Sequence, residues 1–329
     1  QGSAATMARL RHDLIGSWIS QASFEGARRT FERLPTPLIF QMVAWIGFER
    51  GSQAGFPRTI AIVASLFYLL PLFIAILGLS HLWTLYGTPD LGLGAQAATL
   101  GVLIAAVIKA MRSPQNEDRK SKSEAAWWIF VIFGFLLALL RPSIEIGAIA
   151  VCGFLSLSPS RLKFKSTTVT VVAAALVGVS IWSVRETLIF SGLKTGALMF
   201  GGGLASLPLL GGEFVDQLQW LTHSRFLEFL TLNRFLSAPL MMTMTSIAFF
   251  SGGTFSAILA TLSVFTVPYL HVITWYARRS GFREFKIWNE FSFGATAAIL
   301  GAAMASLVKL LEPVVLAGLE VEHIALDRR

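Results

Sequence analysis

Residues 235–277 read FLSAPLMMTMTSIAFFSGGTFSAILATLSVFTVPYLHVITWYA and contain no Asp, Glu, Lys or Arg. A helix that crosses a bilayer needs about 20 apolar residues, so this stretch is long enough to cross twice. The tripeptide Ser251-Gly252-Gly253 lies near its middle and predicts the turn between the two crossings. The stretch therefore predicts an all-α polytopic membrane protein.

The composition of the whole chain agrees with this interpretation. Of its 329 residues, 54% are hydrophobic and 14% are charged, whereas roughly 25% are charged in an average soluble domain. This balance excludes a soluble enzyme, a disordered protein and a nucleic-acid binder. The net charge of +8 indicates basic cytoplasmic loops. The five histidines lack zinc-ligand spacing, so neither a metal nor another cofactor is expected.

Other uncharged runs predict further membrane segments. The longer ones are residues 59–86, 91–108, 166–184 and 291–308. Two shorter apolar stretches, 125–140 and 144–158, the second with Glu145 near its start, flank Arg141-Pro142; a hairpin of two short helices is the simplest interpretation, and one kinked crossing stays open. We expect about ten membrane-inserted segments, several of them short or broken.

The chain also contains an internal repeat. Residues 91–111 (LGLGAQAATLGVLIAAVIKAM) align without a gap on residues 291–311 (FSFGATAAILGAAMASLVKLL), with eight of 21 positions identical. At nearly the same shift Trp18 aligns with Trp220 and Pro37 with Pro239. The alignment predicts a first repeat at 1–112, connecting segments at 113–186, a second repeat at 187–311 and a tail at 312–329.

Loop charges predict that the two repeats have inverted topology. Residues 278–286 carry four basic side chains and their counterpart 84–90 carries none, whereas 49–58 carry two arginines and their counterpart 251–256 carries none. The positive-inside rule then places equivalent loops on opposite sides of the membrane. Residues 9–33 disagree, because five arginines against three acids fall on the predicted outer side. Either this segment is partly embedded in a cavity, or the scheme fails there.

Residues 193–213, LKTGALMFGGGLASLPLLGGE, followed by Trp220-Leu221-Thr222, resemble the second half of the chromate ion transporter family. In that family an FGGG element precedes a PLL…E…WLT segment. In the first half, Gly2-Ser3 falls where the family's FGGP element ends, and Pro35-Thr36-Pro37 with Gln41 resembles its LPGP…Q element. The first repeat is therefore expected to lack its very N-terminus, unless Gly2-Ser3 is an added segment before Met7. The family's Pro-Gly-Pro is altered to Pro35-Thr36-Pro37 here, and its second-half version to Ser237-Ala238-Pro239.

The glycine element is the leading candidate for an anion site. Three glycines in a row disfavour a continuous helix, and a helix that follows the break would present free N–H groups to an anion. Close helix packing through small residues is the alternative. Arg234 offers a planar guanidinium suited to oxyanions, although an arginine that reaches the lipid headgroups explains it equally well.

The resemblance and the repeat together predict the binding residues. They are Gly2, Ser3, Pro35, Thr36, Pro37 and Gln41 in the first half, and Lys194, Gly201, Gly202, Gly203, Asn233, Arg234, Ser237 and Pro239 in the second half. Asp13 and Glu213 form a repeated acidic pair that could bind a coupling proton; a helix cap or a surface position is the alternative.

The resemblance implies a secondary transporter that moves chromate or a sulfate-like oxyanion by alternating access, as a multi-pass protein of the inner (plasma) membrane. The expected partners are the oxyanion and the lipid bilayer, with no nucleic acid, and a homodimer is left open. A membrane-embedded enzyme acting on lipid or isoprenoid and a non-transporting structural homologue are the alternatives. The enzyme would need clustered acids or histidines, which the predicted spans almost lack.

Overall fold

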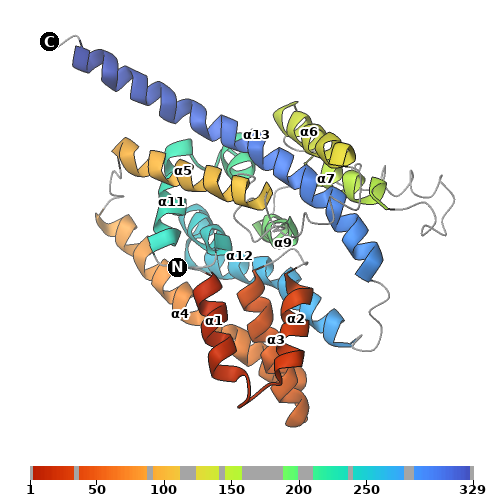
Figure 1. The fold of residues 1–329 in the computed structure, drawn as a ribbon. Coiled ribbons are helices and arrows are strands. Elements are labelled where there is room, and N and C mark those ends of the chain that lie inside the picture. The colour runs from red at the N-terminus through yellow and green to blue at the C-terminus, as the bar shows by residue number, and fades with distance from the viewer. Residues whose placement is uncertain are drawn as a thin grey trace. The chain divides into compact units, whose positions relative to one another are not determined.

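A computed structural model shows the chain as an assembly of helices (Figure 1). It describes residues 3–32, 37–86, 92–111, 124–140, 145–157, 188–198, 210–235, 240–277 and 285–326. The α-helices are α1 (Ser3–Leu14), α2 (Gln21–Phe31), α3 (Leu38–Gln53), α4 (Pro57–Tyr86), α5 (Gly92–Met111), α6 (Glu124–Leu140), α7 (Glu145–Leu155), α9 (Leu188–Leu198), α11 (His223–Phe235), α12 (Thr243–Ala277) and α13 (Phe285–Leu326). A π-helix, η4 (Gly212–Gln217), and a 3-10 helix, η5 (Leu240–Met242), complete the series.

Three of the described helices are long and apolar enough to cross a membrane: Pro57–Tyr86, Thr243–Thr274 and Glu290–Leu316. Two shorter apolar helices, Gln96–Met111 and Glu124–Leu140, accompany them. The chain is thus an all-α polytopic membrane protein, as the sequence predicts. The expected span at 166–184 lies outside the described residues. The expected tail at 312–329 does not begin a separate element, because α13 continues without a break to Leu326.

The chain divides into two compact units, and each unit combines segments from both halves of the sequence. Unit 1 comprises Gln1–Thr88, Thr187–Gly203 and Leu232–Phe282. Unit 2 comprises Pro89–Glu186, Leu204–Thr231 and Arg283–Arg329. These spatial units are a different division from the repeats, whose boundaries remain a prediction from the sequence.

In unit 1, α12 folds back on itself at the predicted turn. Gly252 and Gly253 have non-helical backbone angles, and Gly253 has a φ of 74°, a region that only glycine enters readily. The hydroxyl groups of Thr245 and Thr261 lie 2.8 Å apart, although sixteen residues of continuous helix would separate them by about 24 Å. The two parts of α12, before and after Gly253, are therefore antiparallel, and the predicted turn is confirmed. The part before Gly253 is too short to cross a bilayer, so the prediction of two full crossings is not met.

Helices α3 and α4 form the equivalent hairpin in the first half of the chain. Their backbones approach closely at Gly47, where an added Cβ would lie 2.6 Å from the Cα of Ala61. On the second helix of each hairpin a hydroxyl donates a hydrogen bond to the carbonyl four residues earlier, Ser65 to Ala61 and Thr261 to Ala257.

The two hairpins have opposite orientations within unit 1. The hydroxyl of Tyr269, on the second part of α12, donates to the carbonyl of Arg58 at the start of α4, at 3.3 Å. At the other end of α4, the ring of Trp83 lies 6.4 Å from that of Phe250, beside the turn of α12. The second helices of the two hairpins therefore run antiparallel, and the predicted inversion is present in this pair.

The loop charges follow the inverted arrangement. The first hairpin turns between Arg50 and Arg58, and α12 ends at Ala277, immediately before the basic residues 278–286. The ring of Phe48 stacks 5.1 Å from that of Tyr276, so the first turn and the end of α12 lie at the same end of unit 1. The first turn, with Arg50 and Arg58, thus lies at the same end of unit 1 as the end of α12, which the basic residues 278–286 follow in the sequence.

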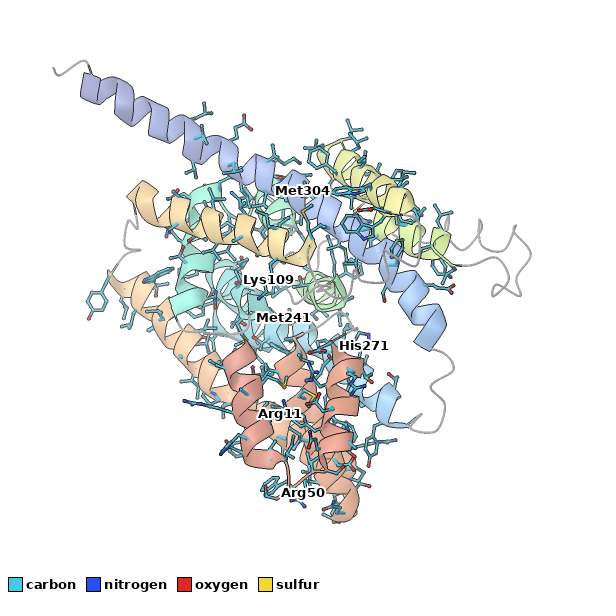
Figure 2. All side chains as sticks on the ribbon, viewed as in Figure 1. Arg11, Arg50, Lys109, Met241, His271 and Met304 are labelled. Atoms are coloured by element: carbon cyan, nitrogen blue, oxygen red, sulfur yellow. The ribbon has the colours of Figure 1, made fainter. Side chains whose placement is uncertain are left out.

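Helices α1 and α2 lie side by side with α3 (Figure 1) and account for the arginine-rich segment at 9–33. Phe24, Ala27 and Phe31 of α2 are buried in a core shared with α3. The polar face of the two helices neutralises much of its own charge. Arg28 contacts both Glu25 and Glu32, and Arg11, labelled in Figure 2, also pairs with Glu25.

Unit 2 is built on α13, the longest helix, with α6 and α7 packed beside it (Figure 1). Gly134 of α6 packs against Ala298, and Lys309 further along α13 reaches the carbonyl of Ala138, so α6 runs parallel to α13. Helix α7 is antiparallel to α13, because Cys152 packs on Gly294 while Ser156 bonds to the carbonyl of Glu290. Helices α6 and α7 therefore form the predicted hairpin of two short helices.

Candidate functional site

The first site element is the start of α3. Pro37 precedes the helix in an extended conformation, and its own side chain makes no capping hydrogen bond. Gln41, at the end of this turn, is completely buried, and neither its amide nitrogen nor its amide oxygen has a hydrogen-bond partner among the described residues. A buried polar group without a partner costs about 1–3 kcal/mol, so the fold carries a stability cost at this position.

The second site element is the start of α12. Thr243 follows Pro239 by four residues, as Gln41 follows Pro37, and the surrounding sequences LIFQM and LMMTM align. Thr243 is completely buried, and its hydroxyl also has no partner in the described part of the chain. Equivalent positions of the two repeats thus carry the same unusual feature: a buried polar side chain with unused hydrogen-bonding capacity.

Helix α3 and the first part of α12 both begin at the level of Phe265, which lies on the second part of α12. The ring of Phe40, next to Gln41, lies 4.8 Å from the ring of Phe265. The pairing of Thr245 with Thr261, continued along the antiparallel hairpin, brings Met241 to the level of Phe265 as well. Met241, labelled in Figure 2, is buried at the start of this hairpin. The two helix N-termini therefore lie at the same level along the second part of α12.

This level is deep within the predicted membrane layer. Phe40 also contacts Tyr68 of α4, with 6.4 Å between ring centroids. Tyr68 is eleven residues from the start of α4, about 16 Å along the helix axis, or roughly half the hydrocarbon thickness of a bilayer. The start of α3 therefore falls near the middle of the predicted membrane layer.

Neutral polar side chains surround the second helix start. Asn233, near the end of α11, is completely buried, and its Nδ2 lies 3.5 Å from the hydroxyl of Ser246. Thr245 and Ser246 are also fully buried. These side chains supply amide and hydroxyl donors without a formal charge. We call Gln41, Asn233, Thr243 and Ser246 the polar cluster.

Helix α9 packs against the same region of α12 and precedes the glycine element in the sequence. Its residues Gly192 and Gly196 pack against Ser263 and Val264. Helix α9 ends at Leu198, three residues before Gly201. Lys194 is half-buried on this helix and has an interaction of its own, and the described contacts do not bring it to the polar cluster.

Many of the predicted binding residues cannot be compared with the structure. Those outside the described residues are Gly2, Pro35, Thr36, Gly201, Gly202, Gly203, Ser237 and Pro239, and the side chains of Ser3 and Arg234 also lie outside. The roles expected of them remain predictions. Of the rest, Gln41 and Asn233 are fully buried in unit 1, and Pro37 begins the helix that carries Gln41.

The repeated acidic pair differs in its surroundings. Asp13 is exposed and lies 3.0 Å from the Nδ1 of His12. Glu213 is buried in the π-helix η4 and belongs to unit 2, whereas Asp13 belongs to unit 1. A surface position thus describes Asp13 but not Glu213.

Sequence reasoning missed Thr243 and Ser246. The signal for Thr243 was available: the shift of 202 residues that aligns Pro37 with Pro239 also aligns Gln41 with Thr243. A threonine in an apolar run is ordinary by itself, and only its complete burial without a partner distinguishes it.

Inverted hairpins whose short helices begin at mid-membrane and carry inward polar groups are typical of membrane transporters. Residues 2–157 and 186–325 match the chromate transporter family. The chain belongs to this family, and it is an ion transporter by that membership.

Individual relatives agree with the family match. The chain is 26% identical to the chromate transport protein of Pseudomonas aeruginosa over 327 residues, which cover 94% of this chain and 77% of that protein. It is 21% identical to the chromate transport protein of Cupriavidus metallidurans, with coverage of 94% and 78%. It is 24% identical to a probable chromate transport protein of Synechococcus elongatus, with coverage of 94% and 80%. No solved structure matches the chain significantly.

Proposed function

We propose that this protein is a secondary transporter that moves an inorganic oxyanion across the inner (plasma) membrane by alternating access. One observation supports the proposal above others: α3 and the first part of α12 begin at the same level of unit 1, and each carries a buried polar side chain, Gln41 or Thr243, that has no partner among the described residues. A helix N-terminus favours an anion, because its first N–H groups are unsatisfied and its dipole end is positive.

The chemistry of the polar cluster suits a tetrahedral oxyanion. Gln41 and Asn233 offer amide N–H groups, and Thr243 and Ser246 offer hydroxyl groups, so several donors can address different oxygens of one ion. Uncharged donors also hold a dianion without forming a permanent ion pair, which favours release. The names of the relatives suggest chromate, and sulfate has the same tetrahedral shape and charge.

Complete burial of the polar cluster supports alternating access. Gln41, Asn233 and Thr243 have no exposed surface, so an ion can reach them only after helices move. The inverted orientation of the two hairpins supplies two related arrangements, one open to each side of the membrane.

Uptake of radiolabelled chromate, sulfate, molybdate and phosphate into proteoliposomes tests the proposal. We expect saturable uptake of chromate or sulfate, and competition between these two ions. The Gln41→Leu variant should reduce this uptake, and Gln53→Leu, at the exposed end of the same helix, should not. Absence of uptake for all four ions, in protein that is folded and inserted, would refute the proposal.

A further inference from the structure

A second group of titratable side chains, which we call the Asp216 group, lies in unit 2. The Oδ1 of Asp216 lies 3.5 Å from the Nε2 of His223, and its Oδ2 lies 3.5 Å from the Nζ of Lys309. These three residues, with Glu312 and Leu316, line a cavity of about 470 Å³. Asp216 is thus a half-buried carboxylate between two basic groups, with space for water beside it.

The backbone under Asp216 is unusual. Asp216 lies in the π-helix η4, and π-helical turns are rare and frequently occur at functional sites. Gly211, just before η4, packs against Phe226 of α11 and Leu310 of α13, where an added Cβ would lie 3.0 and 3.3 Å from their side chains. The turn that carries Asp216 is therefore held against both helices that provide its basic partners.

Each element packed around Asp216 contributes an identifiable group. Helix α11 contributes His223, and helix α13 contributes Lys309 and Glu312. Lys309 also donates a hydrogen bond to the carbonyl of Ala138 on α6, at 3.4 Å.

Two more carboxylates and an arginine lie close by in the sequence of the same elements. The buried Glu213 shares η4 with Asp216, and on α11 Arg225 pairs with Glu228 at 3.6 Å. Lys309 keeps its contact with Ala138 if Asp216 loses its charge, so protonation of Asp216 leaves no buried cation without a partner.

We propose that Asp216 binds and releases the proton that drives oxyanion transport; this inference rests on the function proposed above. On one side of the membrane the Asp216 carboxylate accepts a proton from hydronium, which forms an O–H bond and leaves water. The neutral acid no longer attracts Lys309 and His223, so η4 is free to change its contacts with α13 and α11. On the other side the O–H bond breaks and the proton returns to water.

Helix α11 carries residues of both groups in its sequence. It begins at His223, which contacts Asp216, and Asn233 follows ten residues later.

The test compares two transport assays in proteoliposomes with radiolabelled sulfate and chromate. Counterflow at equal pH on both sides measures anion exchange without a proton gradient, and accumulation under an imposed pH gradient measures coupling. Asp216→Asn should keep counterflow and lose gradient-driven accumulation. Asp216→Glu, which keeps the carboxyl group, should retain accumulation with a displaced pH profile. Glu32→Gln removes a carboxylate from an ion pair with Arg28 in unit 1 and should leave both assays unchanged.

The outcomes separate this inference from the proposed function. Accumulation that persists in Asp216→Asn would overturn the role of Asp216. Loss of both assays in Asp216→Asn and in Asp216→Glu would also overturn it, because the residue would then be structural. Wild-type protein that exchanges oxyanions but ignores the pH gradient would refute the coupling alone. Wild-type protein without any counterflow would refute the transport function itself.

Discussion

The hydroxyl of Tyr269 donates a hydrogen bond to the backbone carbonyl of Arg58, although the two residues belong to different repeats of the sequence. This contact joins the end of one hairpin's second helix to the beginning of the other's. Together with the contact between Trp83 and Phe250, it shows that the hairpins are related by inversion. Internal symmetry of this kind gives a transporter two related conformations with the same fold.

The first prediction concerns the sides of the membrane. Ser52 lies at the turn of the α3–α4 hairpin and Thr254 lies at the turn of α12, and both are exposed. Single cysteines at these positions, in a Cys152→Ser background, should react with a membrane-impermeant thiol reagent from opposite sides, with Ser52→Cys labelled from the cytoplasm. Labelling of both from one side would contradict the inverted arrangement.

The second prediction concerns the polar cluster. Gln41→Leu removes a buried group that has no partner in the described part of the chain, so the ligand-free protein should become equally stable or more stable. The same change should weaken oxyanion binding by about 1.5–3 kcal/mol, or roughly ten- to a hundredfold, because a hydrogen bond to a charged ligand is lost. Thr243→Val should behave in the same way. Thermal unfolding and equilibrium binding of labelled anion measure the two effects.

A purely structural glutamine would give another result. Gln41→Leu would then lower the unfolding temperature, or leave both stability and affinity as they are. Gln53→Leu is the control on the same helix, since Gln53 is exposed and bonds to Arg50. It should leave anion affinity unchanged.

The third prediction concerns the turn of α12. Gly253 has a φ of 74° with an extended ψ of −166°, a region nearly closed to other residues, so Gly253→Ala should destabilise the protein by about 1–3 kcal/mol. Gly78→Ala is a matched control, because Gly78 lies within α4 with open space around it. Alanine there should be neutral or stabilising by about 0.5–1 kcal/mol. Thermal unfolding in detergent compares the two variants, and equal destabilisation would argue against strain at Gly253.

The fourth prediction concerns pH and the α1–α2 pair. The hydrogen bond from Arg28 lowers the pKa of Glu25 below its ordinary value, with help from the charges of Arg28, Arg11 and Arg29. A lowered folded-state pKa stabilises the fold above the ordinary pKa of glutamate, and this stabilisation disappears as the pH falls through the folded-state value. Glu25→Gln should therefore loosen α1 and α2 at neutral pH and have little effect in acid. Hydrogen exchange of the α2 amides at both pH values measures this.

The opposite pH pattern in this experiment, with the larger effect in acid, would show that the ion pairs do not hold α2. Glu49→Gln, which removes a carboxylate from the neighbouring helix α3, provides the control. It should not change exchange in α2.

The sequence predicted the larger features because each has a strong local cause. Charge-free runs located the helices, and the glycine pair at 252–253 located a turn that only glycine accommodates easily. The loop charges predicted the inversion, which the contacts of Tyr269 and Trp83 confirm. In contrast, burial cannot be read from residue type, so the role of Thr243 emerged only when its hydroxyl was found enclosed and without a partner.

The Asp216 group is a second feature that the sequence alone could not predict. Lys309 is far from Asp216 and His223 in the sequence, and no spacing rule brings the three together. Only the packing of η4 between α11 and α13 does so. The sequence predicted Glu213 instead, three residues before Asp216. Glu213 was selected because this acid aligns with Asp13 in the other repeat.

The interleaving of the two units has a consequence for how the protein is made. Unit 1 needs residues up to Phe282, and unit 2 needs residues from Pro89 to the end of the chain. The first four helices therefore leave the ribosome well before α9 and α12, which complete their core, are synthesised. During that interval α3 and α4 can pack only against each other and the lipid. The α3–α4 hairpin must therefore remain stable in the membrane until the equivalent hairpin of α12 has been synthesised.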